Sequence, residues 1–175
     1  MIAKRIYEHA KLHVDDDFTF VHARRWLNEA LGLISVVCEH GSRVTESVTI
    51  NSTGPEYHDL PDNVIEIKAV YEDSISRENR YQDYVYEGGR IYIPDEGTFL
   101  VEYERTAKDI GLESDTPEVH PQYHFPISYW VASREKLRFN PQDQDGIRLQ
   151  GEFYSQIRTV DLALSRNRRV RKIQV

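Results

Sequence analysis

Apolar residues recur at steps of three and four in four stretches of the chain, which is the spacing of one face of an α-helix. The spacing predicts helices over about residues 2–14, 18–38, 122–139 and 145–165. The most continuous apolar stripe lies in the second stretch and comprises Ala23, Trp26, Leu27, Ala30, Leu31, Ile34 and Val37. The third helix opens with prolines, which fit a helix start, and we expect the rest of the chain to pack against its apolar face.

The other helical stripes are shorter. They comprise Ile2, Ile6 and Ala10 in the first stretch, Ile127, Trp130, Val131 and Leu137 in the third, and Ile147, Phe153, Tyr154, Ile157, Val160 and Leu164 in the last. Four polar residues of the second stretch lie off its stripe and are expected to face solvent or another subunit: Arg24, Arg25, Asn28 and Glu29. The aspartates at 15–17 precede this helix and are expected to cap it, with a metal site as the alternative.

Between residues 44 and 105 the apolar period changes to two, which predicts β-strands. Strands are expected over residues 44–50, 63–71, 81–87, 90–94 and 98–105, with Phe99, Val101 and Tyr103 on one face of the last. Gly88 and Gly89 form a two-residue hairpin signal. The segment is therefore predicted to be a small antiparallel β-meander inserted between helices.

Together these elements predict an α+β fold. Residues 1–165 are expected to form a single domain, an antiparallel bundle of about four helices with the β insertion at 44–105. Residues 166–175 have no apolar period and are expected to form an extended basic tail that carries Arg166, Arg168, Arg169, Arg171 and Lys172.

Charge and composition narrow the class of protein. The net charge is −7, and because the tail carries five positive charges the rest carries −12. No apolar run approaches the roughly 20 residues of a membrane helix, and the first residues lack a signal-peptide core. One cysteine, Cys38, excludes an intramolecular disulfide, suits a reducing compartment such as the cytoplasm, and is expected to pack as a small apolar residue.

The sequence holds no constellation that predicts catalysis, a cofactor or a metal. Gly88 and Gly89 lie in a hairpin rather than in a phosphate-binding loop, and no cysteine pair is present for zinc. His120 and His124 are four residues apart, a spacing that can hold a metal. A proline lies between them, and capping or packing is the favoured interpretation. We therefore expect no enzyme activity.

The order of the elements resembles the head–tail adaptor (connector) proteins of tailed bacteriophages, and also the tail-tubular adaptor of short-tailed phages. The resemblance covers about residues 18–165 and is carried by five segments in order: 23–30 (ARRWLNEA), 59–62 (DLPD), 88–92 (GGRIY), 101–105 (VEYER) and 115–124 (DTPEVHPQYH). The β insertion is longer than in the most compact members of that family.

The resemblance implies a structural virion protein, made in the host cytoplasm and located at the head–tail interface. Such adaptors form a ring, usually of twelve copies, beneath the portal, where they extend the DNA channel and dock the next tail component. The basic tail is the candidate portal contact. The candidate subunit contacts are Tyr84, Tyr86, Tyr92, Arg24 and Arg25. Double-stranded DNA would pass through the lumen without sequence-specific binding, repelled by an acidic wall.

Three other functions remain open from the sequence. A tail-completion or stopper protein would act one layer further from the capsid. A nucleic-acid-binding module would use the basic tail to bind phosphate, with an affinity that falls steeply with salt. An enzyme would use His120, His124 and nearby carboxylates.

Overall fold

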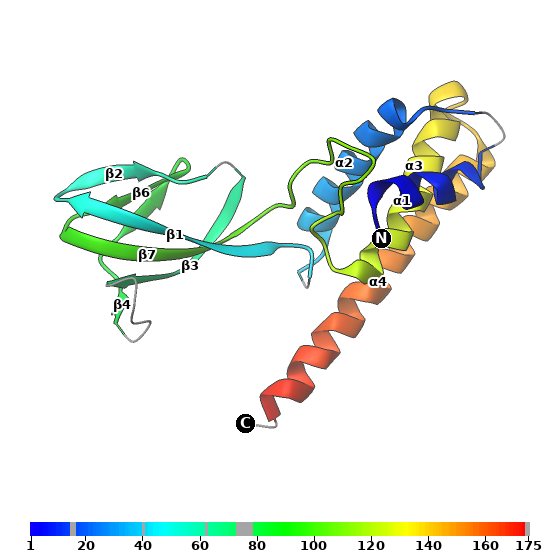
Figure 1. Ribbon diagram of the computed structural model, residues 1–175. Helices are drawn as coiled ribbons and strands as arrows, with labels where there is room; N and C mark the ends of the chain where they lie inside the picture. Colours follow the sequence, from blue (N-terminus) through cyan, green and yellow to red (C-terminus); the bar gives the residue numbers. More distant parts are fainter. Residues whose placement is uncertain (15–16, 40, 62, 73–78, 174–175) are drawn as a thin grey trace. The chain divides into compact units, whose positions relative to one another are not determined.

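The computed structural model describes the chain except residues 15–16, 40, 62, 73–78 and 174–175, and it describes no side chains for 167–173. The chain forms two compact units (Figure 1). The helical unit consists of Met1–Arg43 and Ala107–Val175, and the β unit consists of Val44–Thr106. The α+β class, with four α-helices and antiparallel sheets, is confirmed in the described residues.

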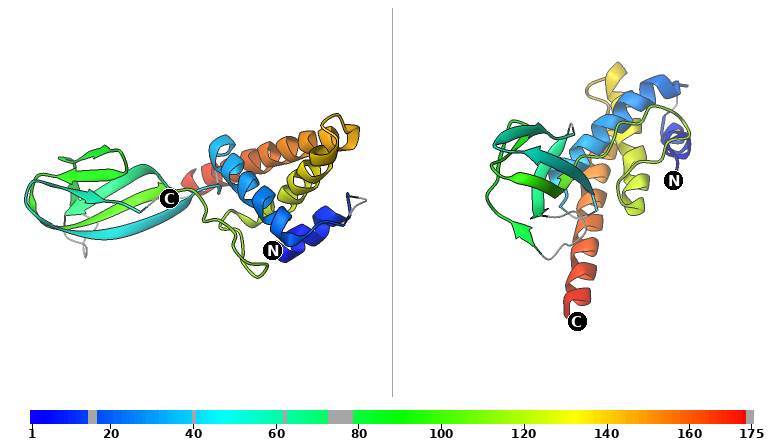
Figure 2. Two further views of the ribbon diagram at one scale, coloured as in Figure 1. Left: turned by 90° about the horizontal axis from the view of Figure 1, so that it is seen from above. Right: turned by 60° about the vertical axis from the view of Figure 1, so that its left-hand side comes forward.

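The helical unit is organised around α3. Its helices are α1 (Ala3–Lys11), α2 (Phe20–Val37), the 3-10 helix η1 (Pro121–Tyr123), α3 (His124–Phe139) and α4 (Gln144–Ile173). α3 contacts α1, α2 and α4, and Figure 2 shows it in contact with them from two sides. Its residues Ile127 and Val131 are fully buried, as are Ile6 of α1, Ile34 of α2 and Phe153 of α4. The expectation that the rest of the chain packs against this helix is confirmed for α1, α2 and α4, but it is wrong for residues 44–106, which form a separate unit with its own core.

Two polar residues predicted to face solvent or another subunit have partners within the helical unit, Asn28 in a connecting segment and Glu29 in α3. The Asn28 side chain accepts a hydrogen bond from the Ile110 amide at 2.7 Å and donates one to the Ile110 carbonyl at 3.2 Å. Glu29 pairs with Arg134 of α3 at 3.1 Å. The prediction is therefore wrong for Asn28, whereas the Glu29 side chain is 36% exposed and still faces solvent while it pairs with Arg134. At the end of the same stripe, Val37 is exposed because it is the last residue of α2.

At the start of α4, the apolar residue that faces the core is not the one that was predicted. Ile147 is 48% exposed, whereas Leu149 is buried and continues the line of Phe153 and Ile157. The reason lies at Gly146, where an added Cβ would come within 2.9 Å of the Leu137 side chain. This close approach of α3 and α4 fixes which side of the first turn is inward, so Ile147 is left outside.

α4 is longer than the apolar pattern indicated. It continues to Ile173, so residues 166–173 are helical and the prediction of an extended tail is wrong for them. The segment contains no glycine or proline, and arginine and lysine are good helix formers, so the helix extends past its last packed turn. In both figures this end of α4 reaches beyond the other helices of the unit.

The β unit contains two antiparallel sheets. Its strands are β1 (Val44–Thr53), β2 (Glu56–Asp59), β3 (Val64–Glu72), β4 (Arg80–Tyr81), β5 (Val85–Glu87), β6 (Arg90–Ile93) and β7 (Glu96–Arg105). One sheet has the order β1-β7-β3-β4 and the other the order β2-β6-β5. The hairpin at Gly88 and Gly89 is confirmed, since Glu87 pairs with Arg90 and both glycines have positive φ.

The meander prediction is wrong. In a meander consecutive strands are neighbours, but β7 lies between β1 and β3 and pairs with both. The inward residues of β7 lie in one core cluster with Ile91 and Ile93 of its sequence neighbour β6, so the two strands contribute to the core from different sheets instead of pairing. β2 was not predicted, because its four residues (EYHD) are mostly polar.

The two sheets share one apolar core. From β7 it takes Phe99, Val101 and Tyr103, as predicted, and from β6 it takes Ile91 and Ile93. The other buried members are Ile50, Leu60 and Val70. The β unit thus has its own core, distinct from that of the helical unit.

Candidate assembly interfaces

The basic end of α4 is one candidate interface. Among the described side chains of α4, Ile157 is the last fully buried one, and half-buried Val160 and Leu164 carry the packing one or two turns further. Arg166 follows and is exposed, and Arg168, Arg169, Arg171 and Lys172 belong to the same helix. The backbone of the predicted portal contact is therefore a helix that continues past its packed region.

A second candidate interface lies where α2 meets α3. The guanidinium groups of Arg25 and Arg134 each lie 5.0 Å from the Trp26 ring, and Arg134 is also 5.6 Å from the Trp130 ring. Arg138, one turn along α3, has Nη1 3.3 Å from Nδ1 of His22. We call Arg25, Arg134 and Arg138 the arginine cluster. Arg134 and Arg138, but not Arg25, line a hollow of about 130 Å³ together with Trp26 and Leu137.

Two carboxylates of the same unit contact the arginine cluster, Glu135 from within and Glu29 at the surface. Glu29 accepts from Nε of Arg134 at 3.1 Å. Glu135 is fully buried, pairs with Arg138 at 2.8 Å and lies 3.4 Å from the indole N–H of Trp26. The cluster keeps a net positive charge, because three guanidinium groups meet two carboxylates.

The structure separates the two arginines singled out from the sequence. Arg25 joins the arginine cluster, while Arg24 donates to the Gly111 carbonyl at 3.4 Å on another side of α2. Arg134 and Arg138 were not among the predicted site residues. Their spacing of four places them on one face of α3, but only the packing of α2 beside α3 brings Arg25 to them.

The predicted tyrosine contacts also separate. Tyr84 and Tyr86 pack against the core of the β unit. Tyr92 lies on the outer face of the β2-β6-β5 sheet, where it is paired with Tyr57 on one side and Val85 on the other. Its neighbours on this face, Tyr57 and Val85, are 50% and 53% exposed, and neither was predicted. Of the three tyrosines, only Tyr92 points away from the core.

The outer face of the four-stranded sheet is acidic. Alternate residues of β7 face outward, and among them are Glu96, Glu102 and Glu104, while Glu66 of β3 is paired with Glu104. We call these four glutamates the acidic face. Lys68 neutralises part of it through contacts of 2.9 Å with Glu66 and 3.3 Å with Glu104.

Charge is divided unequally between the two units. The β unit has 14 acidic and five basic residues, a net charge of −9, so the helical unit carries +2. The acidity attributed to the whole body of the chain is thus concentrated in one unit.

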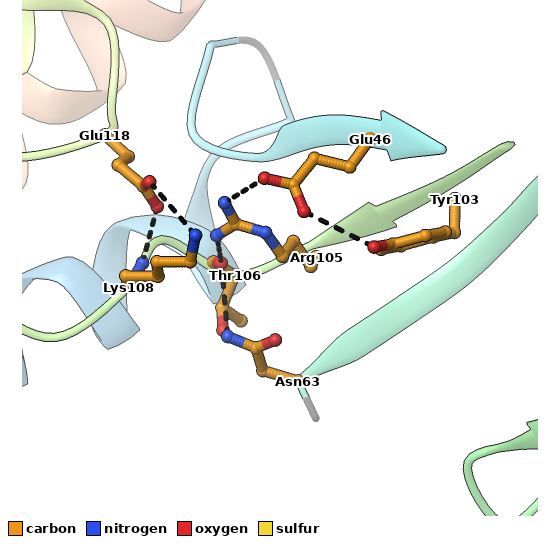
Figure 3. Close-up of polar contacts among 7 residues, drawn as sticks. All are labelled: Glu46, Asn63, Tyr103, Arg105, Thr106, Lys108 and Glu118. Atoms are coloured by element: carbon orange, nitrogen blue, oxygen red, sulfur yellow. Dashed lines mark hydrogen bonds and ion pairs between the residues drawn. The ribbon is translucent and has the colours of Figure 1, made fainter. Parts of the chain in front are cut away.

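An ion pair between a buried arginine and a partly exposed glutamate connects β7 to β1 in the β unit (Figure 3). Arg105, only 2% exposed, lies at the end of β7 and contacts Glu46 of β1 at 2.5 Å. It also donates to the Thr106 carbonyl at 2.8 Å, and the Tyr103 hydroxyl lies 3.3 Å from the Glu46 carboxylate. Asn63, with a φ of 68°, accepts from the Thr106 amide through its carbonyl at 3.1 Å. These contacts tie the last strand to the first and to the start of β3.

In the helical unit, Glu118 fixes the segment that follows the β unit. Its carboxylate accepts from the Lys108 amide at 2.8 Å and lies 4.0 Å from the Lys108 ammonium (Figure 3). The contact orders the connection between residue 107 and η1.

The two histidines considered for a metal have structural contacts. His120 caps η1 through a 3.4 Å contact between its Nδ1 and the Gln122 amide, and its own amide donates to the Gly41 carbonyl at 2.7 Å. His124 is buried, with Nε2 near the carbonyls of Pro117 and Val119 and Nδ1 2.8 Å from the Met1 amine. Burial, and then the charge of that amine, lowers the pKa of His124.

Cys38 is a buried residue of the same core. It is 1% exposed, and burial raises the pKa of its thiol to about 11. The thiol is therefore protonated near neutral pH, and its predicted packing role is confirmed.

The other chemical predictions concern absences. Within the described residues, no three His, Cys, Asp or Glu side chains come close enough to hold a metal ion. None of the described helices is long and apolar enough to cross a membrane. The capping prediction for residues 15–17 lies mostly outside the described residues. Asp17 forms an ion pair with Lys11, and the N-cap of α2 is Thr19, without a side-chain capping bond.

Comparison with known proteins identifies the family. No curated protein matches the sequence. The model of the SU10 adaptor protein family matches residues 2–173, which is nearly the whole chain and includes both units. The earlier resemblance to phage adaptors is thereby confirmed. The chain belongs to the SU10 adaptor protein family and is a bacteriophage adaptor with a structural role at the junction of head and tail.

Proposed function

We propose that this protein is the head-to-tail adaptor that forms a ring beneath the portal, extends the DNA channel and docks the next tail component. The family match over residues 2–173 is the observation that carries the proposal. We expect twelve copies in the ring, each contacting its neighbours through two unlike surfaces, because a closed ring of one protein requires heterologous contacts.

The portal contact is the basic end of α4. It extends past the last packed residues of that helix, and its five positive charges follow one another within seven residues, Arg166 to Lys172. A helix that is already formed loses less conformational entropy on docking than an extended tail would. A cationic helix end is complementary to a negatively charged or carbonyl-rich groove on the portal.

Truncation tests this contact. A chain that ends at Ser165 retains every residue of α4 that is buried among its described side chains, so it should keep its fold and lose about tenfold or more in affinity for purified portal particles. Affinity would be measured by surface plasmon resonance with the portal immobilised, and folding by tryptophan fluorescence.

Charge reversal at two pairs of positions in α4 tests whether portal binding depends on positive charge at the C-terminal end or on positive charge anywhere along the helix. Arg168→Glu with Arg171→Glu should weaken portal binding, whereas the same reversal at exposed Arg148 and Arg158, nearer the start of α4, should not. Wild-type affinity of the Ser165 truncation for the portal would remove the C-terminal end from the proposed contact. Salt-dependent DNA binding lost on truncation would favour a nucleic-acid-binding module instead.

The DNA channel follows from the division of charge. A β unit with a net charge of −9 repels phosphate, so a duplex that passes it is not held. We propose that double-stranded DNA moves through the ring without sequence-specific binding. Images of the protein assembled on the portal would test the ring, its rotational order and its position. Density outside the collar below the portal would contradict the proposal.

A further inference from the structure

The arginine cluster is an exposed cationic site on an acidic chain. Arg25 is exposed, and the side chains of Arg134 and Arg138 are 34% and 37% exposed, while the protein as a whole carries −7. Stacking on Trp26 holds the guanidinium groups of Arg25 and Arg134 in place. Their positions are thus fixed before any partner binds, which lowers the entropic cost of binding.

The hollow beside the cluster has the size and chemistry for an acidic side chain. Its volume of about 130 Å³ is that of roughly four water molecules, enough for a carboxylate and its methylene groups. Trp26 and Leu137 supply apolar lining, and Arg134 and Arg138 supply cationic walls. Guanidinium groups bind carboxylates with two parallel hydrogen bonds, and arginine and tryptophan are the residues most enriched among interface hot spots.

The two neighbouring carboxylates, buried Glu135 and partly exposed Glu29, do not occupy the whole arginine cluster. Glu135 is fully buried and meets Arg138 from the inside, and Glu29 engages Nε of Arg134. Among the described residues, the stack on Trp26 is the one recorded contact of Arg25. An incoming carboxylate would therefore meet a site with a net positive charge.

Every copy of the chain carries a surface of the opposite sign. The β unit has a net charge of −9, and its acidic face presents Glu102 and Glu104 at the end of β7, Glu66 of β3 paired with Glu104, and Glu96 at the start of β7. Lys68 offsets one of these charges. A cationic patch on one unit and an acidic sheet on the other form the two unlike surfaces that a heterologous contact between identical chains requires.

We propose that the arginine cluster of one copy binds the acidic face of the β unit of a second copy. This inference rests on the proposed ring and names the surfaces that close it. A second copy fits better than DNA, because the site is a small hollow with an apolar floor and the β unit of the same chain would repel a duplex.

Reciprocal charge reversal tests the pairing. Arg25→Glu alone should lower the number of copies bound per portal particle about tenfold, because like charges would then face each other. Glu96→Arg with Glu102→Arg should do the same. Combining all three substitutions should restore assembly to near the wild-type level. Native mass spectrometry of the portal complex would count the copies, and circular dichroism would check the fold of each variant.

The matched control is Arg5→Glu, the same reversal at an exposed position of α1, which should assemble like the wild type. If wild-type protein does not assemble on the portal, the proposed function itself fails. If it does assemble and the reversals have no effect, or the combined variant is not restored, only the pairing is overturned. Loss of duplex affinity for Arg25→Glu without loss of assembly would assign the cluster to DNA and would also overturn it.

Discussion

The helical unit and the β unit build their cores from the chain in opposite ways. The helical unit joins segments from both ends of the sequence, so that Ile6, Ile34 and Phe153 meet around α3. The β unit is one continuous segment whose first and last strands pair along their whole length. The helical unit carries +2 and the β unit −9. One chain thus holds two bodies of opposite charge, each with its own apolar cluster, and we expect them to unfold separately.

The largest expected effect is on the core of the helical unit. Phe153 is fully buried, with its ring 5.0 Å from that of Trp130, so Phe153→Ala should cost about 3–5 kcal/mol in the free energy of unfolding of this unit. Both tryptophans, Trp26 and Trp130, lie in the helical unit, so chemical denaturation followed by tryptophan fluorescence measures it directly.

The control for this substitution is Leu162→Ala, on the same helix but 62% exposed, which should cost less than about 0.5 kcal/mol. Hydrogen exchange in β3 and β7 should be the same in Phe153→Ala as in the wild type. Equal acceleration of hydrogen exchange in both units would contradict the expectation of separate unfolding, because it would mean that the two cores unfold together.

The second effect is on the ion pair that connects β7 to β1 in the β unit. Glu46→Gln removes the charge that faces Arg105, a guanidinium that is 2% exposed. Glu46 is itself 37% exposed. The loss in the free energy of unfolding of the β unit should therefore be about 2–3 kcal/mol, near or below the lower end of the range for broken buried ion pairs. Hydrogen exchange of β1 and β7 should accelerate, while the tryptophan-detected transition should stay unchanged.

The matched control is Glu66→Gln, which weakens a solvent-exposed pair with Lys68 and should cost less than about 1 kcal/mol.

The smallest expected effect is a difference between the two units in how their stability depends on pH. Burial is the main cause that lowers the pKa of His124 and of His13 below the ordinary 6.5, so the folded helical unit binds fewer protons than the unfolded chain. Its stability should be complete above pH 6.5 and fall as the pH drops below that value. In the β unit, hydrogen bonds from Thr53 lower the pKa of Glu56, so that contribution is lost only below the ordinary carboxyl value of 4.5.

The test is denaturation of each unit at pH 7 and at pH 5.5. The tryptophan-detected stability should fall between these values, and exchange in the β unit should not change. His13→Gln should reduce the fall by removing one of the two groups. A fall in the β unit of equal size would contradict the assignment of mild-acid sensitivity to the helical histidines.

Local patterns predicted the elements better than their arrangement. The stripe of α2 and the hairpin at Gly88 and Gly89 depend on short-range spacing and turn chemistry, and both are present. The pairing of β7 with β1 depends on contacts some 50 residues apart, such as that between Val48 and Val101, which no local pattern contains. The inward side of α4 was missed at Ile147 because it depends on how closely Gly146 approaches α3.

The candidate interfaces were predictable only in part. Five basic residues near the C-terminus are visible in the sequence, but their helical backbone was not predicted, because residues 166–173 have no apolar period. Arg25 was predicted as a contact, while its neighbours Arg134 and Arg138 lie more than 100 residues away and join it only when α2 packs on α3. Tyr57 and Val85 were missed because the sequence does not show which face of the β2-β6-β5 sheet packs on the core and which is exposed to solvent.

The pairing of Val44 with Arg105 puts the entry and exit of the β unit opposite each other in one ladder. Paired Cα atoms in such a ladder are separated by about 4.5–5.5 Å, so a tight turn of a few residues could join residue 43 to residue 107 in its place. Residues 44–106 could therefore be lengthened, shortened or replaced at this one junction without a change in the core of the helical unit.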